Sequence, residues 1–170
     1  MTSGQQERKS KQRKIRNSEY YDMEGTFDRL YAESKKDKTF NHLMEIIESE
    51  ENIKLAYRTI KKNTGSDTSG VDKRTIADLA KLSEEEYVRL IRKQFSNYHP
   101  RPVRRVDIPK PNGKTRPLGI PTIVDRIVQQ CILQVMEPIC EAKFSENSNG
   151  FRPNLSLIHI SEPTRRVVIS

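Results

Sequence analysis

Residues 98–121 read YHPRPVRRVDIPKPNGKTRPLGIP, two short extended segments joined by Pro-Asn-Gly. Asn112-Gly113 is a strong short-range hairpin signal, typical of a type I′ turn in which both central residues have positive φ. The stretch carries six Lys or Arg side chains against a single acid, Asp107. We therefore expect one antiparallel β-hairpin over about residues 103–120. Three basic side chains lie near its tip: Lys110, Lys114 and Arg116.

A positive hairpin with a tight tip is suited to holding polyphosphate or a nucleic-acid backbone, although a solvated basic hairpin is the alternative. The whole chain of 170 residues has a formal charge of +8, which indicates an anionic partner such as RNA, DNA or a membrane surface. No apolar run reaches the length of a membrane span, and no signal-peptide pattern opens the chain. Because the basic residues do not share one amphipathic helix, nucleic acid is the favoured partner. Only 34% of the residues are hydrophobic and none is Trp, which is lean for a self-sufficient core.

The sequence offers little metal chemistry. Cys131 and Cys140 are too few and too far apart for a metal knuckle, and we expect both to be reduced. The three histidines, which have no ligand spacing between them, are His42, His99 and His159. We therefore assign no metal ligand to these residues.

Helical periodicity dominates the part before the hairpin. Residues 1–25 are a polar, basic head that we expect to be disordered. Apolar residues at helical spacing then predict helices over residues 26–36, 40–48 and 50–62. A fourth helix opens at the capping box formed by Ser83 and Glu86 and runs to about Tyr98; beyond the hairpin, a fifth begins with Thr122 as N-cap and ends near Glu137, where Pro138 breaks or restarts it.

Residues 63–72, NTGSDTSGVD, read as a loop because Gly65 and Gly70 bracket small hydroxyl side chains. Lys61 and Lys62 lead directly into it. Backbone amides freed by Gly and Ser beside two lysines can take a phosphate. A plain connection between two helices is the alternative.

Two stretches carry a family resemblance: IPKPNGKTRPLGIPTIVDRIVQQCIL at residues 108–133 and FSENSNGFRPN at residues 144–154. Their order resembles the fingers region of bacterial reverse transcriptases, above all the intron maturases encoded by group II introns. Residues 53–76, which end the Gly-rich loop in Gly-Val-Asp, resemble the N-terminal extension of these enzymes. The resemblance implies an α+β fold, with an α-rich N-terminal extension at 26–98 and the fingers of a right-hand polymerase at 99–154. The palm and the thumb are missing.

The resemblance also implies roles for single residues. Lys110 and Arg116 correspond to the side chains that bind the triphosphate of the incoming nucleotide. The loop 63–72 corresponds to a lid over the RNA template. The residues implied to contact template RNA are Lys61, Lys62, Gly65, Gly70, Arg104, Arg105, Phe151 and Arg152.

The carboxylates that hold Mg²⁺ in the family are absent, because the chain has no Tyr-x-Asp-Asp and its only acid after Asn154 is Glu162. The resemblance therefore implies a truncated RNA-directed DNA polymerase whose parent uses Mg²⁺ and assists splicing and mobility of its intron. Implied partners are intron RNA as template, a DNA primer or target and deoxynucleotide triphosphates, in a ribonucleoprotein of the bacterial cytoplasm and without a membrane. Two alternatives stay open: this chain alone is a non-catalytic RNA-binding module, or the parent is a related retron-type enzyme.

The tail, residues 155–170, departs from the family pattern directly after GFRPN. Residues 155–165, LSLIHISEPTR, resemble the translation of a transposon-end sequencing adapter. We therefore expect this tail to be an artefact. A natural, divergent strand built on the apolar run LIHI is the alternative.

Overall fold

The computed structural model describes residues 21–145 and Ser148. The predicted head up to residue 20, Phe151, Arg152 and the tail 155–170 lie outside the described residues. The helices are α2 (Glu24–Lys35), α3 (Leu43–Ile47), α4 (Glu50–Lys62), α5 (Ile76–Leu79), α6 (Glu84–Ser96) and α7 (Ile123–Glu141), and the strands are β1 (Arg104–Pro109) and β2 (Thr115–Ile120). The predicted α+β composition with an antiparallel hairpin is confirmed over this part of the chain.

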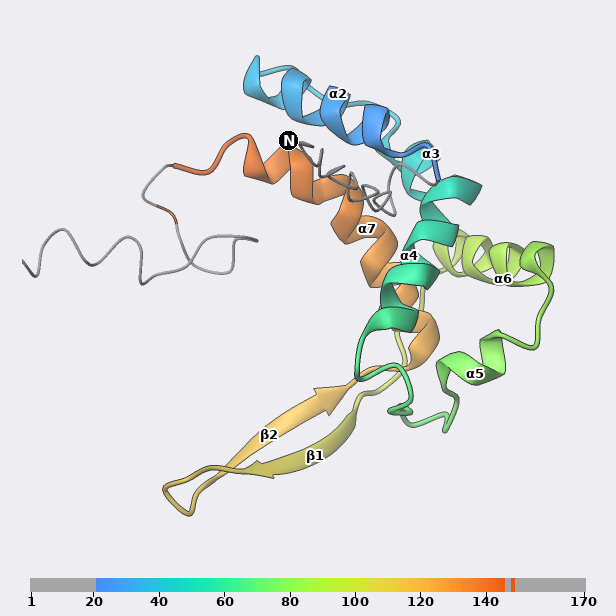
Figure 1. Ribbon diagram of the computed structural model, residues 1–170, viewed down its shortest axis with the longest axis vertical. Helices are drawn as coiled ribbons and strands as arrows, with labels where there is room; N and C mark the ends of the chain where they lie inside the picture. Colours follow the sequence, from blue (N-terminus) through green and yellow to red (C-terminus); the bar gives the residue numbers. More distant parts are fainter. Residues whose placement is uncertain (1–20, 146–147, 149–170) are drawn as a thin grey trace, which may run out of the picture.

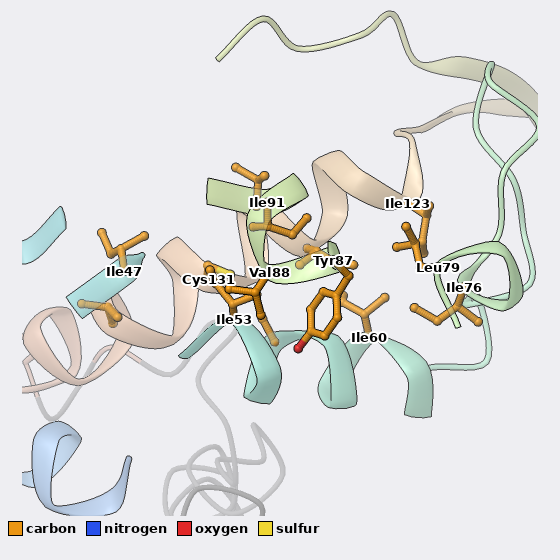
Figure 2. Close-up of a cluster of buried hydrophobic side chains, with 14 of the residues drawn as sticks. Ile47, Ile53, Ile60, Ile76, Leu79, Tyr87, Val88, Ile91, Ile123 and Cys131 are labelled. Carbon is orange, nitrogen blue, oxygen red and sulfur yellow. The ribbon is translucent and has the colours of Figure 1, made fainter. Parts of the chain in front are cut away.

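Helix α7 is the centre of the helical body. Helices α2 and α4 pack along it, α3 and α6 touch it, and the hairpin projects away from all of them (Figure 1). Figure 2 shows the buried cluster between these helices, in which Ile53 of α4, Ile91 of α6 and Cys131 of α7 have no exposed surface. Within the described part of the chain, no helix combines the length and apolarity needed to span a bilayer.

A buried polar pair joins α4 to α7 inside this core. The Asn52 side-chain amide donates to the carbonyl oxygens of Ile47 (2.9 Å) and Cys131 (3.1 Å). In return, the Gln134 amide donates to the backbone carbonyl (2.6 Å) and the side-chain oxygen of Asn52. Because a buried amide is costly unless it is paired, these bonds favour one register of α4 against α7.

The helix-start signals are confirmed. The Ser83 hydroxyl accepts from the Glu86 N–H at 3.3 Å, and the Glu86 carboxylate accepts from the Ser83 N–H at 2.8 Å. Thr122 caps α7 through the Asp125 N–H at 3.2 Å. The bounds of α4 agree with the prediction made from its apolar stripe, and Ser49 caps the helix by accepting from the Asn52 N–H at 3.2 Å.

Two predictions about helices are wrong, and one helix was missed. Helix α3 begins at Leu43 rather than near residue 40, because His42 has φ 62° and a left-handed residue cannot continue a helix. Helix α7 runs through Pro138 to Glu141 without a break. There α2 supports it, since the buried Ser34 hydroxyl donates to the Ile139 carbonyl at 2.8 Å. The short helix α5 was not predicted.

The hairpin turn differs from the predicted type I′. The Gly113 N–H donates to the Lys110 carbonyl at 3.1 Å, so Pro111 and Asn112 are the central residues. The ring of Pro111 holds its φ negative, which excludes type I′. Gly113 follows with φ +76° and the Lys110 N–H then donates to the Lys114 carbonyl at 2.7 Å, the pattern of a three-residue loop with a glycine bulge.

Candidate nucleic-acid interface

The register of the hairpin divides its basic side chains between two faces. Arg104 pairs with Ile120, and Ile108 pairs with Arg116. Since residues two apart on a strand share a face, Arg104 and Arg116 lie on the same face. The backbone pair Lys110–Lys114 continues this alternation beyond the strands, so we place both lysines on that face as well. We call the four side chains Arg104, Lys110, Lys114 and Arg116 the basic face; all are exposed.

Arg105 belongs to the opposite face, because it pairs with Gly119 and neighbours the Asp107–Pro117 pair on that side. The predicted template contacts Arg104 and Arg105 therefore point to different sides of the ribbon. Gly119 packs closely on Val103, whose Cγ2 would lie 3.0 Å from an added Cβ. Of the two arginines, Arg104 is the one that shares a surface with Lys110 and Arg116.

Arg104 also connects the hairpin to the loop 63–72, since its Nε donates to the Ser69 carbonyl at 3.0 Å. Two segments that lie 35 positions apart in the sequence thus meet at the base of the hairpin. The hairpin and the loop, the predicted nucleotide-binding and template-binding segments, are therefore neighbours at the base of the hairpin, next to the N-terminus of α7 (Figure 1).

Arg126 fixes the loop 63–72 by donating hydrogen bonds to its carbonyl groups. Nη1 of Arg126 donates to the Gly65 carbonyl at 2.7 Å, and Nη2 donates to the Thr68 carbonyl. Nε of Arg126 donates to the Pro121 carbonyl at 3.2 Å. Burial, and secondarily the nearby charge of Arg104, lower the pKa of Arg126, while Asp72 opposes the shift. An arginine remains charged under such a shift.

Gly70 allows the loop 63–72 to pack closely against the start of α7. The residue is buried, and a Cβ added to it would lie 2.7 Å from Thr122 Cα, 2.9 Å from Thr122 N and 3.0 Å from the Pro121 carbonyl oxygen. The loop backbone therefore rests directly on the start of α7, at a distance that only glycine permits. Gly65, in contrast, has open space around it.

The loop 63–72 also has backbone N–H groups that are free to donate. The N–H groups of Asp67 and Ser69 donate to no described residue, and Asp67 is exposed. Lys61 and Lys62 are exposed in the last turn of α4, and the Lys61 ammonium lies 5.8 Å from the centre of the Tyr57 ring. The predicted loop residues thus sit together beside unpaired N–H groups, which suits an anionic partner.

Two acidic side chains, Asp125 and Asp72, lie near the N-terminus of α7. Asp125 is buried and accepts from the Thr122 hydroxyl at 2.6 Å and the Tyr98 hydroxyl at 3.2 Å. The Asp72 side chain, 8% exposed, accepts from the Arg74 N–H at 3.3 Å and lies 3.8 Å from Arg101. Among the described residues, no group of three side chains is arranged to hold a metal ion.

Arg126 is a residue of this site that sequence reasoning missed. It lies in the stretch DRIVQ, residues 125–129, and was not assigned a role, although its position carried a signal. A cation in the first turn of a helix opposes the helix dipole, so a basic residue there needs a compensating partner. The carbonyls of the loop supply that partner.

Comparison with known proteins agrees with the sequence motifs. The chain is 43% identical to "Protein YkfC" of Escherichia coli K12 over 121 residues, which cover 69% of this chain and 31% of the relative. It is 35% identical over 123 residues, 71% of this chain, to "Group II intron-encoded protein LtrA" of Lactococcus lactis, covering 20% of that protein.

A yeast relative, the "Putative COX1/OXI3 intron 1 protein" of Saccharomyces cerevisiae, is 29% identical over 133 residues, 76% of this chain and 16% of the relative. No family model matches the chain. The chain thus spans less than a third of the length of each of these relatives. Over the matched residues, it is a homologue of group II intron-encoded proteins.

Proposed function

We propose that this chain is the N-terminal extension and fingers of an RNA-directed DNA polymerase encoded by a group II intron. The observation that carries the proposal is the meeting of a basic hairpin and a Gly-rich loop at the start of α7, in a chain homologous to group II intron-encoded proteins. The proposed parent copies intron RNA from a DNA primer or target, uses deoxynucleotide triphosphates and Mg²⁺, and assists splicing of its own intron. It works in a ribonucleoprotein of the bacterial cytoplasm.

Within this proposal, the two ends of the hairpin have different tasks. Lys110 and Arg116, toward the tip, bind the triphosphate of the nucleotide, the lysine as a point charge and the arginine as a fork. At the base, Arg104 and the loop 63–72 bind template phosphates. Arg105 contacts the template backbone from the other face of the ribbon. Lys61 and Lys62 add positive charge next to the loop.

The catalytic chemistry belongs to residues outside this chain. Nucleotide addition needs carboxylates that hold two Mg²⁺ ions, and the sequence contains no Tyr-x-Asp-Asp. We therefore propose that the chain alone is a non-catalytic RNA-binding module. A retron-type parent is the second candidate, because the shared motifs lie in the fingers of both kinds of enzyme.

The test is to determine the gene sequence beyond Asn154, express the full parent and compare it with the 170-residue chain on a primed RNA template with Mg²⁺. The full parent should extend the primer and the chain alone should not. Arg116→Ala in the parent should lower kcat/KM for nucleotide about tenfold or more, the factor expected for one charge-assisted hydrogen bond, with RNA affinity nearly unchanged. Primer extension by the chain alone, or a full parent that extends no primer, would refute the proposal.

A further inference from the structure

Arg126 makes three hydrogen bonds to backbone carbonyls, and none of the roles proposed above explains them. Its three guanidinium nitrogens each donate to a backbone carbonyl: Gly65 and Thr68 of the loop, and Pro121 at the end of the hairpin. The loop carbonyls lie 61 and 58 positions away in sequence. One side chain therefore joins the loop, the end of the hairpin and the first turn of α7.

The chemistry of this contact requires an arginine. A guanidinium is planar and presents five N–H donors in a fixed fork, whereas a lysine ammonium is a compact point charge on a flexible stem. Carbonyl oxygens that converge from three directions match the fork. A lysine at this position would keep the charge and still lose the simultaneous bonds.

We propose that Arg126 is a positioning residue, which holds the loop 63–72 in the shape that binds RNA. By drawing the Thr68 carbonyl inward, it turns the Ser69 N–H of the same peptide away from the protein and leaves it available to phosphate, and its bond to the Gly65 carbonyl holds the turn next to the unpaired Asp67 N–H. Arg104 reinforces the arrangement from the hairpin through the Ser69 carbonyl. This inference rests on the proposed RNA-binding role of the loop.

Arg126 acts through the loop and not as a phosphate ligand. The side chain is half-buried, and each of its nitrogens already donates to a carbonyl of the protein. Three of its five N–H groups are therefore committed to the backbone. The donors offered to an anion are chiefly those of the loop and of the basic face.

Two variants and one control separate positioning from charge. Arg126→Lys keeps the charge without the fork, and Arg126→Ala removes both. Arg92→Ala is the matched control, because Nε of Arg92 donates to the single Glu48 carbonyl at 3.0 Å, away from the loop. In each variant of the 170-residue chain, hydrogen exchange is followed by NMR at two amides that donate to loop carbonyls, Thr68 to Gly65 (3.1 Å) and Ile76 of α5 to Ser66 (3.3 Å). RNA affinity is measured with a fluorescein-labelled oligouridine at one fixed salt concentration.

In both Arg126 variants, the Thr68 and Ile76 amides should exchange at least about tenfold faster, the factor that one charge-assisted hydrogen bond contributes. The core amide of Ile53, which donates to the Ser49 carbonyl at 3.0 Å, should keep its protection, and this shows that the fold persists. Oligouridine affinity should fall about tenfold in both variants. Arg92→Ala should change neither readout.

Three results would overturn the inference. Unchanged loop exchange in Arg126→Lys would show that the loop holds its shape without the fork. Faster loop exchange with unchanged affinity would show that the shape of the loop does not matter to RNA. Normal affinity in Arg126→Lys with loss only in Arg126→Ala would make Arg126 a direct charge contact. If the wild-type chain bound no oligouridine at all, the proposed RNA binding would fail instead, and the exchange data would still decide whether Arg126 fixes the loop.

Discussion

Replacing Gly70 with Ala tests the contact between the loop 63–72 and α7. The added Cβ would lie 2.7 Å from Thr122 Cα, 2.9 Å from Thr122 N and 3.0 Å from the Pro121 carbonyl oxygen. All three atoms are backbone, so no side-chain rotation relieves the clash and a chain segment must shift. Overpacking of this kind costs about 1–3 kcal/mol of the free energy of unfolding. For a domain of this size the melting temperature should then fall by roughly 3–15 °C.

Gly65→Ala is the matched control in the same loop. Nothing lies within 4 Å of a Cβ added at Gly65, and its φ is outside the positive range that penalises alanine. Alanine there also restricts the unfolded chain, which stabilises by about 0.4–1 kcal/mol where the native conformation is compatible. The two variants should therefore shift stability in opposite directions.

Thermal melts followed by circular dichroism, with urea denaturation as a second measure, compare the three proteins. We expect Gly70→Ala to melt below the wild type and Gly65→Ala to melt at or slightly above it. Equal melting temperatures for both variants would refute the close packing of Gly70 on Thr122. A larger loss at Gly65 would show that the loop is oriented differently.

Three further predictions concern the helical body. Burial raises the pKa of the Cys131 thiol to about 12, so iodoacetamide at about pH 8 should label the half-buried Cys140 first, and equal labelling by mass spectrometry would contradict the burial. The Ser83 N–H at the N-cap of α6 donates to the Glu86 carboxylate and lowers the pKa of that carboxylate from the ordinary 4.5. The stability from this bond is therefore present above that pH and is lost as the pH falls below it. Glu86→Gln should flatten the fall in melting temperature between about pH 5 and 3, and an unchanged pH profile would show that the cap does not cause the fall. Ile132 and Leu133 on α7 are 40% and 54% exposed, and we expect the chain to self-associate through this apolar surface. Replacing both with Ser should reduce self-association in analytical ultracentrifugation, and unchanged association would show that this surface is not a contact between chains.

The parts of the fold that depend on local signals were predictable. The Ser83 and Thr122 caps mark helix starts through hydrogen bonds within one turn, and the bounds of α4 follow from its apolar stripe. Where tertiary packing decides, local signals failed: α7 continues through Pro138 because α2 packs against its last turns. The hairpin was placed correctly and its turn was not, because Pro111 takes a central position that the Asn-Gly signal ignores.

The candidate site was predictable as a set of segments and not as an arrangement. Charge and glycine content identify the hairpin and the loop, but the sequence does not indicate that Arg104 reaches the Ser69 carbonyl. Nor does it separate Arg104 from Arg105, since that depends on the strand register. Arg126 was hidden because its partners are backbone carbonyls, which every residue has.

The most direct test of the central claim is the salt dependence of RNA binding by the 170-residue chain. If Lys61, Lys62, Arg104 and Arg105 engage RNA phosphates, log affinity for oligouridine should fall linearly with log salt concentration with a slope of roughly −3, about 0.7 per phosphate neutralised on a single strand. Replacing Lys61 and Lys62 with Gln should make the slope shallower by about 1.4. An affinity that is indifferent to salt, or a slope that these two substitutions leave unchanged, would contradict the account.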